Sequence, residues 1–219
     1  MVITAIEPQK RHRNRLNIFV DGEFAFGIDR NVLLKHGLRK GDAIDPEIFR
    51  KVAEDEELSR ARTRAMRLLS YRLRTELELQ TRLREDEFPP SVIEKVLTEL
   101  RTSGYLDDSA FARAYLHDVR MRKPAGKRFL SVQLRRKGVP KDLTTQVLEE
   151  QYSEADELES AVALATKTIR RFRSSVRPLS PEQQSRRLTN ALSRRGFSWP
   201  TIRSVLKKFF TNVHTLREE

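Results

Sequence analysis

The stretch "QLRRKGVPKDLTTQVL", Gln133 to Leu148, decides the fold of this chain. Leu134 closes one predicted helix, and Gly138 offers the left-handed backbone conformation that commonly follows a helix end. Val139 supplies an apolar contact, and Pro140 suits the start of the next helix, where the missing N–H would be unpaired anyway. The stretch therefore predicts a helix-turn-helix step.

The same layout occurs twice more, in "RLREDEFPPSVIEKVL" (Arg82 to Leu97) and "ALSRRGFSWPTIRSVL" (Ala191 to Leu206). Each copy has a Leu near the helix end, an apolar residue five positions later, then a Pro and a second apolar helix. The first copy carries Glu87 where the other two carry glycine, so we expect a weaker helix end there. Recurrence at spacings of 51 and 58 residues predicts a repeat protein.

One further amphipathic helix is predicted ahead of each copy, at roughly residues 59–71, 109–121 and 157–172. The predicted domains are therefore three three-helix repeats: residues 53–107, 108–152 and 153–219. A unit of this size buries little apolar surface alone, and stacked units bury more. We expect a mostly α chain, with tandem repeats in an elongated, curved, solenoid-like body.

The N-terminal residues, 1–52, predict a small β-rich module instead. In "RLNIFVDGEFAFGI" (Arg15 to Ile28), apolar residues alternate on both sides of Asp21-Gly22, a pair that favours a tight hairpin turn. Asp29 suits the N-cap of a short helix that follows, and Asp45-Pro46 begins another helix. No strand is predicted after this module.

The charge of the chain points to an anionic partner. Its 219 residues carry 43 Lys and Arg against 31 Asp and Glu, a net charge of +12. Residues 1–50 carry 9 basic and 7 acidic side chains and residues 51–108 carry 11 and 13, whereas residues 109–152 carry 10 and 4 and residues 153–219 carry 13 and 7. We therefore expect the basic surface, and a polyanion such as nucleic acid, on the C-terminal half.

Several other classes of protein are disfavoured. The chain has no cysteine, so it offers no disulfide and no thiolate metal site, which fits a reducing compartment. The start, "MVITAIEPQKRHRNR", lacks the apolar run of a secretory signal, and no segment has the roughly 20 apolar residues of a membrane span. The interpretation is a cytoplasmic protein.

Catalysis and cofactors are not indicated either. The four histidines are scattered, and the chain contains neither a GxxxxGK[ST] loop nor a GxGxxG turn. The acidic run from Glu85 to Glu87 precedes a helix whose N-terminus favours negative charge. We therefore expect no enzyme activity, no metal and no cofactor.

The segment "SGYLDDSAFARAY", Ser103 to Tyr115, places two adjacent carboxylates behind a turn. Adjacent side chains diverge, so Asp107 and Asp108 make a poor metal or acid/base pair. A joint between helices is the better interpretation: Gly104 ends one helix, and Tyr105 and Leu106 fold back as apolar plugs. Asp107, Asp108 or Ser109 caps the next helix.

These motifs together resemble the RecX family of regulatory proteins. The resemblance is carried by "YRLRTELELQTRL" from Tyr71, "IEKVLTELRTSGYLDDSAFARAYLHDVR" from Ile93 and "GKRFLSVQLRRKGV" from Gly126, and by the repeat pattern beyond residue 153. Many members also carry an N-terminal hairpin module. The family often has Gly-Pro before the basic residues that here follow Pro124-Ala125-Gly126.

The resemblance implies a non-enzymatic modulator. RecX proteins bind the RecA recombinase, especially its filament on single-stranded DNA, and inhibit its ATPase, strand-exchange and coprotease activities. The implied setting is DNA recombination, DNA repair and the SOS response. No heptad or strongly apolar surface helix demands a dimer, so a monomer is expected.

Basic residues at matching positions of successive repeats predict a charged stripe for RecA-filament or DNA binding. The candidates are Arg120, Arg122, Lys123, Lys127, Arg128, Arg135, Arg136, Lys137, Arg170, Arg171, Arg173, Arg194 and Arg195. The structural alternative is that these are solvated helix faces whose stems cover apolar surface. Since the charges spread over several helices, we expect contacts with phosphates or protein rather than with base edges.

Two hypotheses on function remain open from the residues. One is a protein-interaction modulator of the RecA filament; the other is an independent nucleic-acid-binding protein that contacts phosphates through its helix-turn-helix repeats. Aromatic residues do not decide between them, because they fall at repeat positions expected to lie in the core. These residues are Phe88, Phe111, Tyr115, Phe197 and Trp199.

Overall fold

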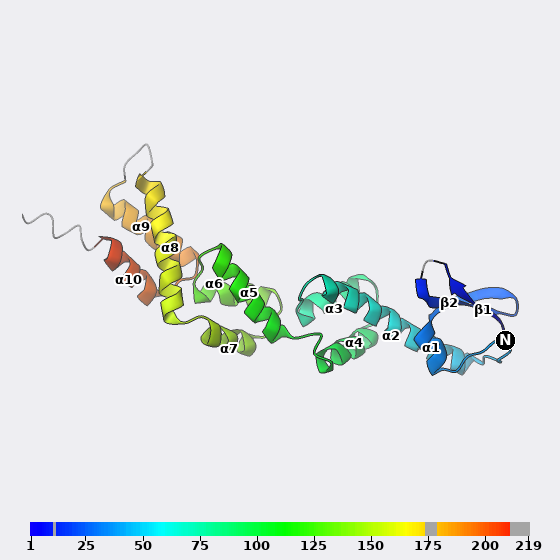
Figure 1. The fold of residues 1–219 in the computed structure, drawn as a ribbon. Helices are drawn as coiled ribbons and strands as arrows, with labels where there is room; N and C mark the ends of the chain where they lie inside the picture. The colour runs from blue at the N-terminus through cyan, green and yellow to red at the C-terminus, as the bar shows by residue number, and fades with distance from the viewer. Residues whose placement is uncertain (11, 174–178, 211–219) are drawn as a thin grey trace, which may run out of the picture. The chain divides into compact units, whose positions relative to one another are not determined.

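The computed structural model describes residues 1–10, 12–173 and 179–210. These residues form two compact units, shown in Figure 1: the first holds Met1–Arg74 and Glu78–Leu106, and the second holds Thr75–Leu77 and the described residues from Asp107 onward. Both units are mostly helical, and the first also carries a three-stranded sheet.

The sheet is antiparallel in the order β1-β2-β3, with strands β1 (Ile3–Gln9), β2 (His12–Val20) and β3 (Glu23–Asp29). Asp21 and Gly22 join the last two strands with φ angles of 51° and 91°, which confirms the predicted hairpin. Ile3, Ile18 and Ile28 are fully buried on one face. This face forms the core of the N-terminal module.

Helix α2 (Pro46–Tyr71) is tied to the sheet through a buried carboxylate. Glu56, 8% exposed, accepts a hydrogen bond from the backbone N–H of Asp29 at 2.7 Å and pairs with the Arg15 guanidinium at 2.7 Å. A buried charge needs such partners. Asp29 also caps the short helix α1 (Arg30–Lys35), as predicted, by accepting from the N–H of Asn31 at 2.8 Å.

The first repeat consists of the C-terminal half of α2, α3 (Glu76–Glu85) and α4 (Pro90–Thr102). Its first helix is not separate, as residues 59–71 suggested, but continues a single helix of 26 residues. The physical reason is that no Pro or Gly interrupts the chain between Glu47 and Tyr71. Within the first unit, Ala61, Leu83 and Val96 meet in its core.

The second unit holds two further repeats. The first of these is α5 (Asp108–Arg122), α6 (Lys127–Arg136) and α7 (Lys141–Gln151), and the next is α8 (Glu154–Arg173), α9 (Pro181–Arg194) and α10 (Trp199–Phe210). Each has its own apolar cluster. The predicted tandem three-helix repeats are therefore confirmed, while the numbered domain boundaries stay predictions.

The turn between the second and third helix of every repeat contains one residue in the left-handed region. Gly138 and Gly196 have φ angles of 96° and 71°, and Glu87 has a φ of 63° at the same position of the first repeat. The left-handed conformation crowds a side chain but not a glycine. Glu87 is therefore a strained helix end.

The Asp107-Asp108 pair is a joint and its two carboxylates serve different helices. Asp107 caps α5 by accepting from the N–H groups of Ser109 and Ala110 at 2.8 and 3.0 Å, and Asp108 accepts from the N–H of Glu76 at 2.9 Å. In the first unit Leu106 is buried, as expected, but Tyr105 is 58% exposed and is not an apolar plug.

One aromatic residue was wrongly expected in the core. Phe111 and Phe197 are buried and Phe88 and Tyr115 are half-buried, whereas Trp199 is 57% exposed. Trp199 begins α10, at the repeat position that Pro90 and Lys141 occupy in the other repeats, and all three side chains face solvent. The conserved apolar position of the layout is two residues earlier.

Replacing Glu87 by Gly should stabilise the first unit by about 0.5–1 kcal/mol, because it relieves the left-handed strain at some cost in chain entropy. Urea unfolding of the full chain measures the change. The control is Glu94→Gly within α4, which should lower the free energy of unfolding by about 1 kcal/mol. A loss of stability in both variants would contradict the assignment of strain to Glu87.

Candidate functional site

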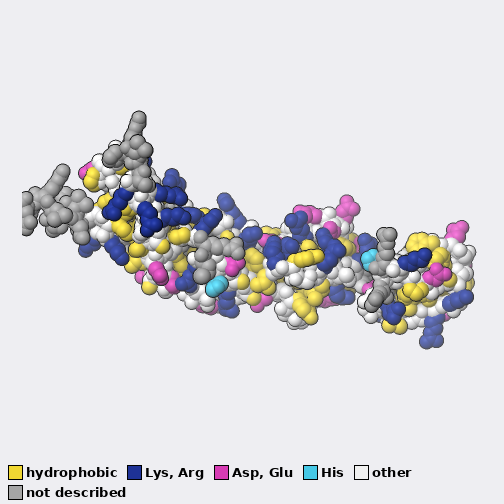
Figure 2. All heavy atoms as spheres, turned by 45° about the horizontal axis from the view of Figure 1, so that its top comes forward, with side chains coloured by type: hydrophobic (Ala, Val, Ile, Leu, Met, Phe, Trp, Pro, Cys, Tyr) yellow, Lys and Arg dark blue, Asp and Glu magenta, His cyan; other side chains and the backbone are white. Residues whose placement is uncertain are grey.

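Two grooves on the second unit are lined by arginine side chains. The larger, about 530 Å³, lies between α8 and α9, and the smaller, about 250 Å³, lies between α6 and α9. Arg194 lines both, so they form one continuous surface. We call this surface the basic groove and define it by six residues: Arg128, Arg136, Arg171, Arg187, Arg194 and Arg195. Figure 2 shows Lys and Arg side chains, in dark blue, gathered over this part of the unit.

Helical spacing brings these side chains to the groove from three elements. Arg187 and Arg194 lie seven residues apart on α9, which places them on one face two turns apart. Arg128 and Arg136 are eight residues apart on α6, and Arg171 lies in the last turn of α8. The groove therefore depends on how α6, α8 and α9 pack together.

The charge of the groove is not neutralised locally. No Asp or Glu is among the described residues that line it. Within the described part of the chain, five of the six arginines form no ion pair with a carboxylate: Arg128, Arg136, Arg187, Arg194 and Arg195. Several unpaired cations along one concave surface focus a positive potential and attract an anionic partner.

Direct backbone contacts fix the floor of the groove. The N–H of Gly126 donates to the carbonyl of Arg195 at 2.9 Å, and the N–H of Arg128 donates to the carbonyl of Gly196 at 3.2 Å. The Arg195 guanidinium lies 5.6 Å from the centre of the Phe129 ring, a cation–π contact. The α5–α6 turn and the α9–α10 turn are thus held in contact.

A buried carboxylate completes this contact. Glu157 on α8 is 3% exposed, accepts from the N–H of Lys127 at 2.9 Å and from the hydroxyl of Thr201 at 3.1 Å. It thereby caps the N-terminus of α6, which has no side-chain cap of its own. One side chain joins α6, α8 and α10.

Arg120 has a structural role. It pairs with Asp156, donates to the carbonyl of Gln151 at 3.1 Å and lies 5.6 Å from the centre of the Tyr152 ring. Hydrogen bonds from Ser153, together with the Arg120 guanidinium, hold the pKa of Asp156 below its ordinary value. This guanidinium is therefore engaged with the second unit itself.

The structure brings together five of the residues that the sequence suggested, namely Arg128, Arg136, Arg171, Arg194 and Arg195. The side chain of Arg122 lies outside the described residues. The others do not line the groove: Arg120, Lys123, Lys127, Arg135, Lys137, Arg170 and Arg173. Their part in binding stays a prediction.

Sequence reasoning missed Arg187. It is not part of the aligned turn, so comparing repeats does not find it. The signal available was helical: in "PEQQSRRLTNALSR" a spacing of seven residues puts Arg187 on the same face as Arg194.

The described residues offer little for other chemistry. No group of three or more His, Asp or Glu side chains within them could hold a metal ion. None of the helices described is both long and apolar enough to cross a membrane.

Models of four RecX domains match the chain. The regulatory protein RecX N-terminal domain matches residues 1–45, and the first, second and third three-helix domains of RecX match residues 61–100, 107–148 and 155–206. These matches cover most of both units.

Full-length relatives agree with these matches. Regulatory protein RecX of Clostridium acetobutylicum is 31% identical over 211 residues, which span 95% of this chain and 96% of the relative. Regulatory protein RecX of Bacillus subtilis is 32% identical over 204 residues, 93% of this chain and 75% of the relative.

Solved structures show the same fold. A crystal structure of regulatory protein RecX superposes with a TM-score of 0.78 at 28% identity, over 93% of this chain and 98% of that one. The crystal structure of RecX from Lactobacillus salivarius gives a TM-score of 0.64 at 22% identity, over 70% and 97%, and supports the fold alone.

Gly126→Ala should disrupt the floor of the basic groove. The φ and ψ angles of Gly126, −85° and 164°, suit any residue, but an added Cβ would meet the carbonyl oxygen of Gly196 at 2.3 Å. We expect a loss of about 1–3 kcal/mol in the free energy of unfolding, measured by urea titration. The control, Ser193→Ala at an exposed position of α9, should change it by less than about 0.5 kcal/mol. Equal stability of the two variants would show that the turns are not in close contact.

Proposed function

The chain belongs to the RecX family of regulatory proteins, and from this premise we propose that it binds the RecA recombinase and its filament on single-stranded DNA. In this proposal it inhibits or modulates the ATPase, strand-exchange and coprotease activities of RecA. The observation that carries the proposal is the basic groove, whose arginines have no carboxylate among its described lining residues.

The shape and charge of the groove suit a partner with repeated negative charge. Its arginines come from three helices, so they follow a surface rather than converge on one point. A filament on single-stranded DNA offers both phosphates and acidic protein side chains along its length. Guanidinium groups bind either with two parallel hydrogen bonds.

Base recognition is not favoured. A sequence reader places several Arg, Asn or Gln side chains of one helix against base edges. Here the groove offers one amide from α6, Gln133, and one from α9, Asn190, among arginines of three helices. The proposed contacts are therefore made to phosphates and to protein, independent of sequence.

The remaining parts of the proposal follow from the family. We propose that the protein acts in the cytoplasm as a monomer, in DNA recombination, DNA repair and the SOS response. The exposed residues around the groove are proposed as secondary contacts: Lys123, Arg135, Arg170 and Arg173. An independent nucleic-acid-binding protein is the alternative, and the experiment below separates the two.

The purified protein should slow DNA-stimulated ATP hydrolysis by RecA at substoichiometric amounts. In Arg187→Ala/Arg194→Ala, about 10- to 30-fold more protein should be needed for half-inhibition, since two charge-assisted contacts of roughly 1 kcal/mol each are lost. The loss should shrink as salt rises, because screening weakens the wild-type contacts.

The matched control is Lys167→Ala/Arg203→Ala, which removes the same charge from exposed positions of α8 and α10 outside the groove. It should inhibit like the wild type. An unchanged ATPase rate at molar excess of wild-type protein, with tight binding to naked nucleic acid, would support the alternative function instead.

A further inference from the structure

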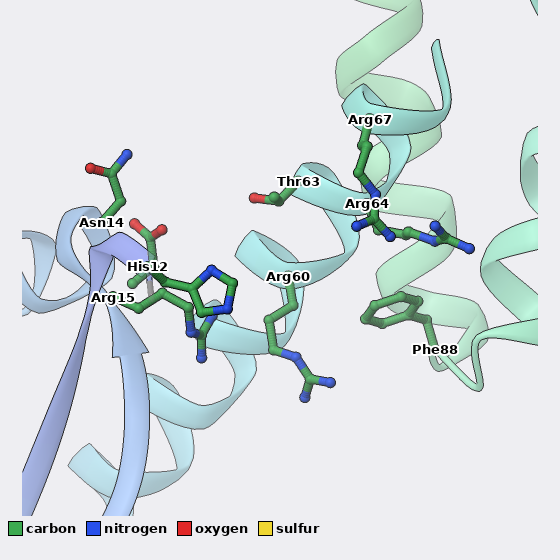
Figure 3. Close-up of a pocket in the computed structure, with 9 residues that line it drawn as sticks. His12, Asn14, Arg15, Arg60, Thr63, Arg64, Arg67 and Phe88 are labelled. Carbon is green, nitrogen blue, oxygen red and sulfur yellow. The ribbon is translucent and has the colours of Figure 1, made fainter. Parts of the chain in front are cut away.

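The first unit holds another pocket that is rich in arginine. This pocket, about 710 Å³, lies between β2 and α2 and is closed on one side by the turn after α3. Figure 3 shows its walls: His12 and Arg15 from the sheet side, a row of α2 side chains, and Phe88 opposite. All its lining residues belong to the first unit.

The α2 row follows helical spacing. Arg60, Thr63, Arg64 and Arg67 lie at positions i, i+3, i+4 and i+7, and therefore on one face. Arg60 and Arg67 stand about 10 Å apart along the helix axis. His12, an exposed residue at the start of β2, lines the pocket on the sheet side, across from this row.

Two of the four arginines are already paired. Arg15 forms an ion pair with Glu56 at 2.7 Å, and Arg64 donates from two nitrogens to Asp86. Among the described residues, neither Arg60 nor Arg67 pairs with a carboxylate. The two paired arginines are held in place by their carboxylates, and the charges of Arg60 and Arg67 remain available to a ligand in the pocket.

One acidic residue lines the pocket, and one of its carboxylate oxygens serves as a helix cap. Asp29 accepts from the N–H of Asn31 at 2.8 Å as the cap of α1. The Arg60 guanidinium lies 5.9 Å from the centre of the half-buried Phe88 ring, so a cation and an aromatic face stand side by side.

We propose that this pocket is a second binding site, which takes a single-stranded nucleic acid by its phosphates. Two unpaired arginines whose backbone positions lie about 10 Å apart along α2 suit a ligand with more than one anionic group. A phosphodiester strand supplies these groups in sequence. The hydroxyl of Thr63 on α2 and the amide of Asn14 on β2 line the same pocket and add hydrogen-bond donors for phosphate oxygens.

Phe88 favours a single strand over an acidic peptide or a duplex. Unpaired bases offer flat faces that stack on aromatic rings and on arginine, whereas Asp and Glu side chains do not. In a duplex the bases are stacked on one another and cannot reach Phe88. The site does not rest on the proposed RecA function, because it requires only naked nucleic acid.

Binding of a fluorescein-labelled 12-nucleotide oligo(dT) to the full chain tests the proposal. Arg60→Ala/Arg67→Ala, made in the Arg187→Ala/Arg194→Ala background to remove the basic groove, should raise the Kd by about tenfold or more. The slope of log Kd against log salt should fall by about 1.4, the value for two lost phosphate contacts on a single strand. Thermal unfolding should change little, since both residues are exposed and only a surface cation–π contact of Arg60 with Phe88 is lost.

The control is Arg84→Ala/Lys95→Ala in the same background, which removes two exposed charges of the first unit outside the pocket and should leave the Kd unchanged. Because the chain has no cysteine, a dye at Ser91→Cys, three residues beyond Phe88, can report on the pocket alone. A quencher-labelled oligo(dT) should quench the dye in the protein that keeps Arg60 and Arg67. It should not quench the dye in the variant that carries Arg60→Ala/Arg67→Ala.

Three outcomes would overturn the site. Equal losses in the two double variants would mean a general charge effect. Tighter binding of a duplex of the same length would exclude the role of Phe88. Competition by polyglutamate as strong as by oligo(dT) would assign the pocket to an acidic protein segment.

Discussion

The second unit depends on one contact between two turns that lie 70 residues apart in the sequence. The backbone of Gly126 and Arg128 bonds directly to that of Arg195 and Gly196, and only glycine permits the approach. Glu157 adds a buried carboxylate that caps α6 from the next repeat. Since Arg128 and Arg195 stand at this contact, the same interaction that joins two repeats places cations from α6 and α9 in one groove. The backbone contact that stabilises the second unit therefore also determines where Arg128 and Arg195 lie.

A helix cap supplied by another helix occurs a second time within the second unit, and one helix is an exception. In residues 75–77 the N–H of Glu76 is capped by Asp108, as Lys127 is by Glu157, and the hydroxyl of Thr75 donates to the carbonyl of Lys137. The middle helices α3 and α6 thus receive their caps from the first helix of the following repeat. Helix α9, in the last of the described repeats, carries its own capping box, in which Ser180 and Gln183 cap each other. Helix ends left unpaired would cost stability, so a cap from within the helix replaces the cap from another helix.

Local chemistry made much of the fold predictable from the sequence. The turn glycines, the prolines that begin helices and the alternation around Asp21-Gly22 predicted the repeats and the hairpin, because each of these signals acts within a few residues. The partner of Asp108 was not predictable, since capping of Glu76 is a contact over 32 residues. Trp199 was misplaced because its repeat position was taken for a core position, whereas it lies in the first turn of α10 and faces solvent. The buried position of that turn is Phe197, two residues earlier.

The candidate sites were harder to predict because charge counts average over faces. Residues 51–108 are net acidic, yet on one face of α2 Arg60 and Arg67 have no carboxylate partner in the described structure. The carboxylates of Glu56 and Asp86 pair with Arg15 and Arg64 instead. Conversely, Arg120 belongs to a basic cluster in the sequence, but its guanidinium forms an ion pair with Asp156 and a cation–π contact with Tyr152. What decides whether an arginine can meet a ligand is the carboxylate beside it in space. That neighbour is set by helix packing, so net charge by segment can indicate the class of partner but not the binding surface.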